Sequence, residues 1–236
     1  SSTSFSWEII VYITSGLALL GGVLMLVLVP NGPYRKGGST LNLSAFLKVF
    51  KNKSFKSAAF GYFGHMWELY AFWAFVPVML QTYVSLHSDS RINIPLYSFL
   101  IISSGSIACV LSGYLSQKFG VKQMALVALS LSGLCCLLSP LLFMTDSIEL
   151  FVVFLMFWGM VVIADSPMFS TLVAQNTTGE LKGTALTIVN CIGFGITIIS
   201  IQVLSFLSNS SNSVYIYSVL AIGPLFGISY LLKKNA

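Results

Sequence analysis

The sequence predicts an all-α integral membrane protein with seven transmembrane helices, the last six of which form one bundle. Composition gives the first reason: 56% of the 236 residues are hydrophobic and only 8% are charged, against about 25% charged in a soluble domain. Segment length gives the second, because seven apolar stretches reach the roughly 20 residues that cross the bilayer core as a helix. Only helices or closed barrels satisfy the backbone in lipid, and barrel strands are short and alternating. The stretches therefore predict a helical bundle.

The predicted spans follow one another along the whole chain. They cover residues 9–30, 57–80, 95–116, 123–144, 150–174, 183–207 and 214–232. The first span has no basic residue before it and the chain does not begin with Met, so the start does not resemble a cleavable signal peptide. We expect a processed or truncated chain.

The first connection, residues 31–56, differs from all the others. It is the longest, and it holds half of the 12 Lys and Arg residues. Apolar residues recur in it at helical spacing with lysines opposite, which predicts a helix lying in the membrane interface; an ordinary solvated linker is the alternative. The apolar positions are Leu43, Phe46, Leu47 and Phe50. We expect three parts: a single helix in 1–30, an inter-domain loop in 31–56 and a six-helix bundle in 57–236.

The basic residues predict the orientation in the membrane. Eleven of them fall on one side of the predicted spans, and the other side has only Arg91, with Glu8, Asp89, Asp146 and Glu149. Because basic connections stay in the cytoplasm, this predicts an outside N-terminus and a cytoplasmic C-terminus. The net charge of +5 then reflects orientation and anionic lipid headgroups, and no nucleic acid partner is expected. The eleven residues are Arg35, Lys36, Lys48, Lys51, Lys53, Lys56, Lys118, Lys122, Lys182, Lys233 and Lys234.

The connection after the third span carries a motif. It reads "GYLSQKFGVKQ", residues 113–123, and it resembles the G-x-L-x-D-R-x-G-R-K signature loop of the major facilitator superfamily. Gln117 stands where the family usually has Asp, and Val121 where it often has a basic residue. Such departures are usual in the second copy of the motif, between helices eight and nine of the twelve-helix fold. The matching residues are Gly113, Leu115, Lys118, Gly120 and Lys122.

The resemblance covers the whole chain. It implies that the first span is the last helix of an N-terminal half and that the rest is the complete C-terminal half. It further implies a secondary transporter, not an enzyme, with no cofactor, in a bacterial inner membrane. A small-molecule substrate would bind at the midplane between two rocking halves, and the missing N-terminal half would be a partner. The stretch "GYFGHMWELYAFW", residues 61–73, also gives a similarity to nitrate and cyanate transporters.

That stretch places ionisable residues in the middle of the second span. Glu68 is three residues after His65, and Tyr62 is three residues before it, so one helical face carries all three. A charged side chain at the bilayer centre costs about 2.5 to 3.5 kcal/mol on insertion scales. Beside an imidazole, the carboxylate could carry a proton or bind a charged substrate group. The alternative is a buried pair that only bonds to a neighbouring helix.

One other acid lies deep in a span. Asp165 precedes Pro167, which loosens a helix as at broken-helix transporter sites; an N-cap-like residue at a kink is the alternative. By the resemblance, spans two and five are helices seven and ten, which line the cavity. We therefore expect cavity-facing carboxylates: Glu68, tuned by His65, and Asp165 would couple proton or sodium movement to substrate binding.

Two other function classes lack their sequence signatures. A seven-span receptor, sensor or accessory membrane protein shares the topology, but the D/E-R-Y and NPxxY motifs and a retinal-binding Lys in the last span do not occur. An intramembrane enzyme would need a pattern such as GxSG or GxGD, and neither occurs. No GxxxxGK[ST], CxxC or HExxH pattern predicts nucleotide or metal binding. The four cysteines all lie in predicted spans and act as small apolar residues: Cys109, Cys135, Cys136 and Cys191.

Overall fold

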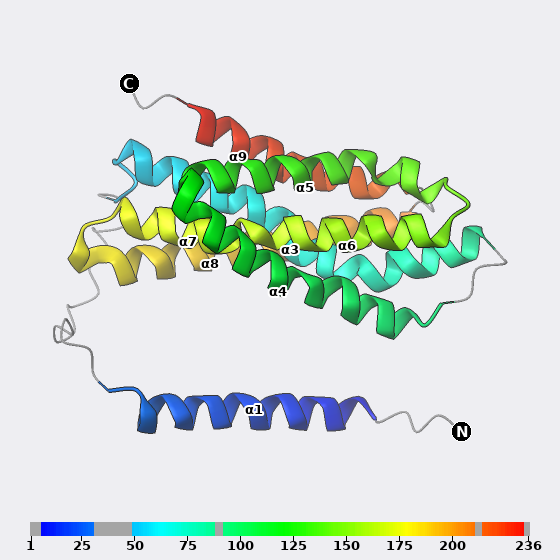
Figure 1. Cartoon of the computed structure of the whole chain (residues 1–236), viewed down its shortest axis with the longest axis horizontal. Helices are drawn as coiled ribbons and strands as arrows, with labels where there is room; N and C mark the ends of the chain where they lie inside the picture. The colour runs from blue at the N-terminus through cyan, green and yellow to red at the C-terminus, as the bar shows by residue number, and fades with distance from the viewer. Residues whose placement is uncertain (1–5, 31–48, 88–91, 211–213, 234–236) are drawn as a thin grey trace. The chain divides into compact units, whose positions relative to one another are not determined.

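The structure, a computed structural model, describes residues 6–30, 49–87, 92–210 and 214–233, and all regular elements within them are helices (Figure 1). Seven of the described helical segments are long and apolar enough to cross a membrane, which confirms the predicted fold class. In chain order the helices are α1 (Trp7–Leu28), α3 (Lys53–Leu86), α4 (Ile94–Phe119), α5 (Val121–Phe143), α6 (Ile148–Ala164), α7 (Ser166–Gln175), the short 3-10 helix η1 (Gly179–Leu181), α8 (Lys182–Ser210), η2 (Val214–Ala221) and α9 (Ile222–Leu232).

The chain divides into two compact units, Ser1–Leu41 and Asn42–Ala236. The described part of the first unit is α1, in which every side chain is exposed. A helix that is apolar on all sides needs an apolar surrounding, so α1 suits contact with lipid or with further membrane helices. The predicted interfacial helix of residues 43–50 lies almost entirely outside the described residues.

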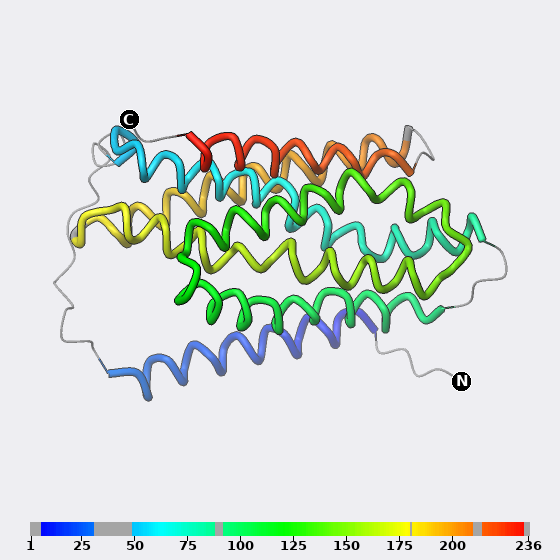
Figure 2. The backbone as a smooth tube through the Cα atoms, turned by 45° about the horizontal axis from the view of Figure 1, so that its top comes forward, coloured from blue at the N-terminus to red at the C-terminus, as the bar shows by residue number. Residues whose placement is uncertain are grey.

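In the second unit, α3 is the central helix. It has 34 residues, and Asn52 caps its start by accepting hydrogen bonds from the backbone N–H groups of Ser54 and Phe55. It packs against α4, α6, α7, α8 and α9, and Figure 2 shows its trace running along the length of the bundle. At 1.5 Å per residue it is about 50 Å long. It therefore extends beyond a roughly 30 Å hydrocarbon layer at one or both ends.

Two apolar clusters fill the bundle along α3. One surrounds Phe72, Tyr83 and Trp158, and the other surrounds Phe55, Met66 and Phe169. Both are built from fully or almost fully buried side chains. Glu68 lies between the two clusters in the sequence, and His65 lies within the second cluster's stretch of α3, so polar groups interrupt the bundle core.

The fifth span is broken where the sequence predicts a loosened helix. Asp165 ends α6 and precedes α7, with Pro167 in the first turn of α7. Because proline has no N–H and fixes φ, the first turn is the most favourable place for it in a helix, although α3 and α5 also hold interior prolines, Pro77 and Pro140. The break brings a carboxylate into the core at a point where the helix has ended.

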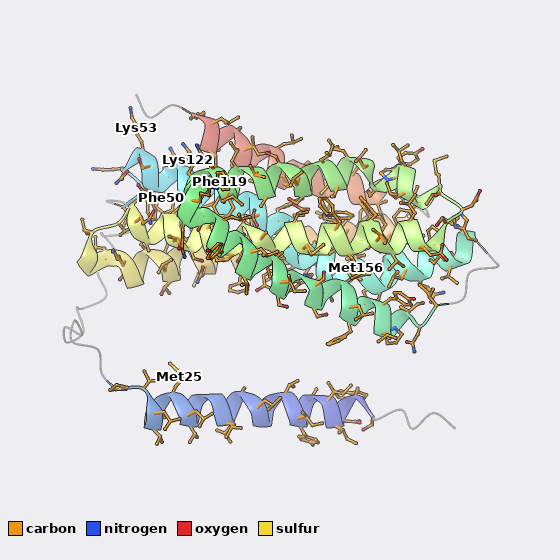
Figure 3. All side chains as sticks on the ribbon, in the orientation of Figure 1. Met25, Phe50, Lys53, Phe119, Lys122 and Met156 are labelled. Carbon is orange, nitrogen blue, oxygen red and sulfur yellow. The ribbon has the colours of Figure 1, made fainter. Side chains whose placement is uncertain are left out.

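Basic residues gather at one end of this unit. Figure 3 shows Lys53, Phe119 and Lys122 at the end where α3 begins and the α4–α5 turn lies. A cavity of about 110 Å³ joins four helices at this end. The cavity is lined by Ser54, Ser57, Ala58, Lys122, Leu172, Asn176 and Leu231.

At the opposite end of the unit, the hydroxyl of Tyr83 donates a hydrogen bond to the carbonyl of Thr145 at 2.6 Å. This bond ties α3 to the acidic α5–α6 connection.

Glycines bring α3 and α9 into close contact. A Cβ atom at Gly64 would collide with the carbonyl oxygen of Gly223 and would lie 2.9 Å from the backbone nitrogen of Gly227. Backbone cannot yield as a flexible side chain can. Small residues are therefore required where these two helices cross.

We predict that Gly64→Ala lowers the free energy of unfolding by about 1 to 3 kcal/mol, the usual cost of overpacking. The matched control is Gly195→Ala in α8, where a Cβ would meet nothing within 4 Å, and where replacing a helical glycine stabilises by about 0.5 to 1 kcal/mol. Thermal unfolding of the purified variants in detergent measures the difference. Equal melting temperatures for the two variants would contradict the close approach of α3 and α9.

Candidate functional site

The predicted site residues of α3 lie inside the second unit. His65 and Glu68 are each 1% exposed and Tyr62 is 7% exposed. Asp165, at the break between α6 and α7, is 0% exposed. These side chains therefore point into the six-helix bundle and not to its outer faces.

Glu68 is held by three donors from two neighbouring helices. Its Oε1 accepts from Trp158 Nε1 of α6 at 2.7 Å and from Cys136 Sγ of α5 at 3.2 Å. Its Oε2 lies 2.9 Å from the hydroxyl of Ser132, also on α5. No basic side chain of the described residues forms an ion pair with Glu68. The carboxyl group joins α3, α5 and α6 through hydrogen bonds alone.

His65 pairs with the other buried acid. Its Nδ1 lies 2.8 Å from Asp165 Oδ1, and both side chains are 1% exposed. The expected tuning of Glu68 by His65 stays a prediction, and the imidazole is directed at the α6–α7 break. The reason is packing, because the rings of Tyr62 and Phe169 flank the imidazole at centroid distances of 5.9 Å.

The His65–Asp165 pair has unused hydrogen-bonding capacity. Among the described atoms, His65 Nε2 and Asp165 Oδ2 are buried and without a hydrogen-bond partner. Buried polar atoms are nearly always paired. The free nitrogen and oxygen can therefore take up a proton, a water or a polar ligand without breaking an existing bond.

Tyr62 is brought beside this pair. It lies one turn before His65 on α3, and its ring also meets Phe169 of α7 edge-on at 6.5 Å. Gly193 of α8 packs against it, since a Cβ there would lie 2.7 Å from the Tyr62 ring. Tyr62 and Phe169 therefore both pack against the imidazole of the ion pair.

The sequence did not single out three residues of this site: Ser132, Cys136 and Trp158. Ser132 and Cys136 are four residues apart and so share a face of α5, which was a readable signal. Cys136 was treated as a small apolar residue, although a thiol is also a weak donor. Trp158 carries no signal in an apolar span until its neighbours are known.

The signature loop lies apart from these residues, at the basic end. α4 ends at Phe119, Gly120 alone connects it to α5, and the N–H of Gly120 donates to the carbonyl of Ser116 at 2.9 Å. Leu115, Gln117, Lys118, Gly120 and Lys122 are exposed and Gly113 is half-buried. Lys118 lies over the ring of Phe119 at 5.4 Å. Lys122 also lines the cavity at this end. The conformational role of the loop stays a prediction.

No group of three or more His, Cys, Asp or Glu residues within the described ranges is placed to hold a metal ion.

The fold and the site define an integral membrane protein that keeps ionisable groups in the core of a helical bundle. The family model of the major facilitator superfamily matches residues 1–201. The chain therefore belongs to the major facilitator superfamily, whose members are transporters and not enzymes. A search of curated proteins found no match.

The geometry of the signature loop gives a prediction. Gly120 has φ 90° and ψ 142°, a region that residues with a Cβ rarely adopt. We expect Gly120→Ala to lower the free energy of unfolding by about 1 to 3 kcal/mol. Gly113→Ala in α4, where a Cβ meets nothing within 4 Å, is the control. Thermal unfolding in detergent checks the prediction, and an unchanged melting temperature for Gly120→Ala would show that this turn is not strained by a side chain.

Proposed function

We propose that the protein is a secondary active transporter that moves a small solute across the membrane by alternating access, coupled to proton movement. The observation that carries the proposal is the buried His65–Asp165 pair at the break of the fifth span, with the two atoms 2.8 Å apart. Ionisable groups inside membrane bundles are costly and mark ion or substrate pathways. Broken helices are where such sites form in secondary transporters.

A proton suits this site better than sodium. The described partners of Glu68 are N–H, S–H and O–H donors, and donors present positive hydrogen atoms that repel a cation. Hard cations such as Ca²⁺ and Mg²⁺ need several oxygen ligands, and Na⁺ is of the same kind. The partner of Asp165 is instead an imidazole, a side chain that can accept and donate a proton.

We further propose that the chain is part of a twelve-helix carrier. The second unit would be the C-terminal six-helix bundle, and α1 would be the last helix of the N-terminal half. The division into two compact units and a match that spans α1 and most of the second unit support this. The substrate would then bind between the halves, with a complete N-terminal half as partner.

The proposed orientation puts the basic end in the cytoplasm. Lys53, Lys122 and the α4–α5 turn share one end of the second unit (Figure 3). Positive charges are retained on the cytoplasmic side and attracted to anionic lipid headgroups. We propose the inner membrane of a bacterium as the location. A sensor or accessory role is the alternative, and it would show no solute movement.

The decisive experiment measures solute-dependent proton movement. The full reading frame, including whatever precedes the Ser1 codon, is expressed, and membrane vesicles are loaded with a pH-sensitive dye. A panel of small anions, including nitrate and cyanate, and neutral solutes is then added. We expect at least one solute to move protons, and we expect Asp165→Asn and Glu68→Gln each to reduce that movement at least tenfold, because each removes an ionisable group from the core.

Matched controls remove the same charges outside the core. Asp146→Asn and Glu149→Gln act on exposed side chains at the far end of the bundle, and we expect near wild-type movement. If both core variants kept the wild-type rate and its pH dependence, proton coupling through these residues would be wrong. If no solute moved in any variant, the sensor or accessory alternative would replace the transporter.

A further inference from the structure

Beside Glu68, two oxygen atoms compete for the single hydrogen of the Ser132 hydroxyl group. The hydroxyl oxygen of Ser132 lies 2.9 Å from Glu68 Oε2 and 3.1 Å from the carbonyl oxygen of Leu129. A serine hydroxyl has one hydrogen. It can therefore donate to the carboxyl group or to the carbonyl, but not to both at once.

Protonation of Glu68 removes this conflict. If Oε2 carries a hydrogen, it donates to the Ser132 oxygen, and Ser132 donates to the Leu129 carbonyl. Both short contacts are then hydrogen bonds. If Glu68 is ionised, the Ser132 hydroxyl group turns its hydrogen to Oε2. The Leu129 carbonyl then keeps only its backbone hydrogen bond. Both states are compatible with the observed positions of the heavy atoms.

The other two contacts do not change between these states. Trp158 Nε1 at 2.7 Å and Cys136 Sγ at 3.2 Å both reach Oε1. They fix Oε1 as the carbonyl oxygen of the acid and leave Oε2 as the oxygen that gains or loses the proton. The hydrogen bonds of Oε1 therefore stay the same in both states, and only those of Oε2 change.

Among the described residues, no Lys or Arg side chain is paired with Glu68 to compensate its charge. The titratable groups around it are Cys135 and Cys136 from α5, Asp165 from the α6–α7 break, and His65 on its own helix. His65 is paired with Asp165. The described parts of α4, α8 and α9 carry Lys118 and Lys182 near their ends and no other Lys, Arg, Asp or Glu. A buried charge without a partner is strongly unfavourable.

We propose that Glu68 is a discrete proton-binding site in which Ser132 is the switch and Trp158 and Cys136 are fixed positioning donors. On binding, a proton passes from water to Oε2 and the Ser132 hydroxyl turns to the Leu129 carbonyl; on release, both changes are reversed. This inference deepens the proposed function and rests on it for its role in transport. It assigns one proton to Glu68, separate from the His65–Asp165 pair.

Infrared spectroscopy of the whole protein in lipid bilayers tests the site directly. A protonated carboxyl group has a C=O stretching band that an ionised one lacks, and the band shifts in D₂O. We expect such a band in the wild type at neutral pH, lost as the pH is raised, and we expect Glu68→Gln to remove it at every pH. Persistence of the whole band in Glu68→Gln would overturn the proposal.

A second pair of variants tests the geometry. Trp158→Phe removes the donor to Oε1, so we expect the band to move to higher frequency, as it does when a carbonyl loses a hydrogen bond. Trp73→Phe is the matched control, because Trp73 Nε1 has no partner among the described atoms, and it should leave the band in place. Cys136→Ala should give a smaller upward shift than Trp158→Phe, and it serves if the tryptophan variant does not fold. A band that no donor variant moves would overturn the assigned contacts.

The test separates this inference from the proposed function. Infrared bands do not depend on transport, so a band lost in Glu68→Gln supports the proton site even if that variant transports normally. In that case only the coupling role of Glu68 would fail. Conversely, loss of coupling in Asp165→Asn with no band from Glu68 would overturn the inference and leave the transporter proposal intact.

Discussion

The structure depends on one constraint: polar groups in the core of a membrane bundle must find partners within the protein. Water and lipid headgroups lie too far from the middle of α3 to serve. His65 and Glu68 therefore take their partners from α5, α6 and the α6–α7 break. These contacts fix how the helices are rotated about their axes, which apolar packing alone specifies weakly.

The glycines of α3 and α9 and the polar contacts belong to one arrangement. Gly64 is the neighbour of His65 in the sequence, and it meets Gly223 of α9 backbone to backbone. One turn further along α3, Glu68 reaches toward α5 and α6, and His65 reaches toward the α6–α7 break. Close packing of α3 against α9 leaves α3 little freedom to rotate, so its ionisable groups are held in register with their partners.

The sequence predicted the spans well because hydrophobic length is a local property. It also predicted the break at Asp165, since Pro167 acts on its own helix. It could not predict that His65 would select Asp165 instead of Glu68, because that depends on how far apart the helices lie and on their rotation. Trp158 and Ser132 were missed for the same reason: each becomes part of the site only through a neighbour from a distant part of the chain. The spacing of Ser132 and Cys136 was visible, but nothing in it named Glu68 as their partner.

The two buried acids have different surroundings and therefore different chemistry. Asp165 faces a base, so the pair can be neutral overall while each member is charged. Glu68 has no base beside it among the described residues, so nothing in contact with it offsets its charge when it is ionised. With Glu68 protonated, the polar core carries no net charge, which is the least costly state in a medium of low dielectric constant. Release of that proton leaves one negative charge in the same core as the His65–Asp165 pair. The charge of Glu68 therefore affects the His65–Asp165 pair electrostatically, without a hydrogen bond between them.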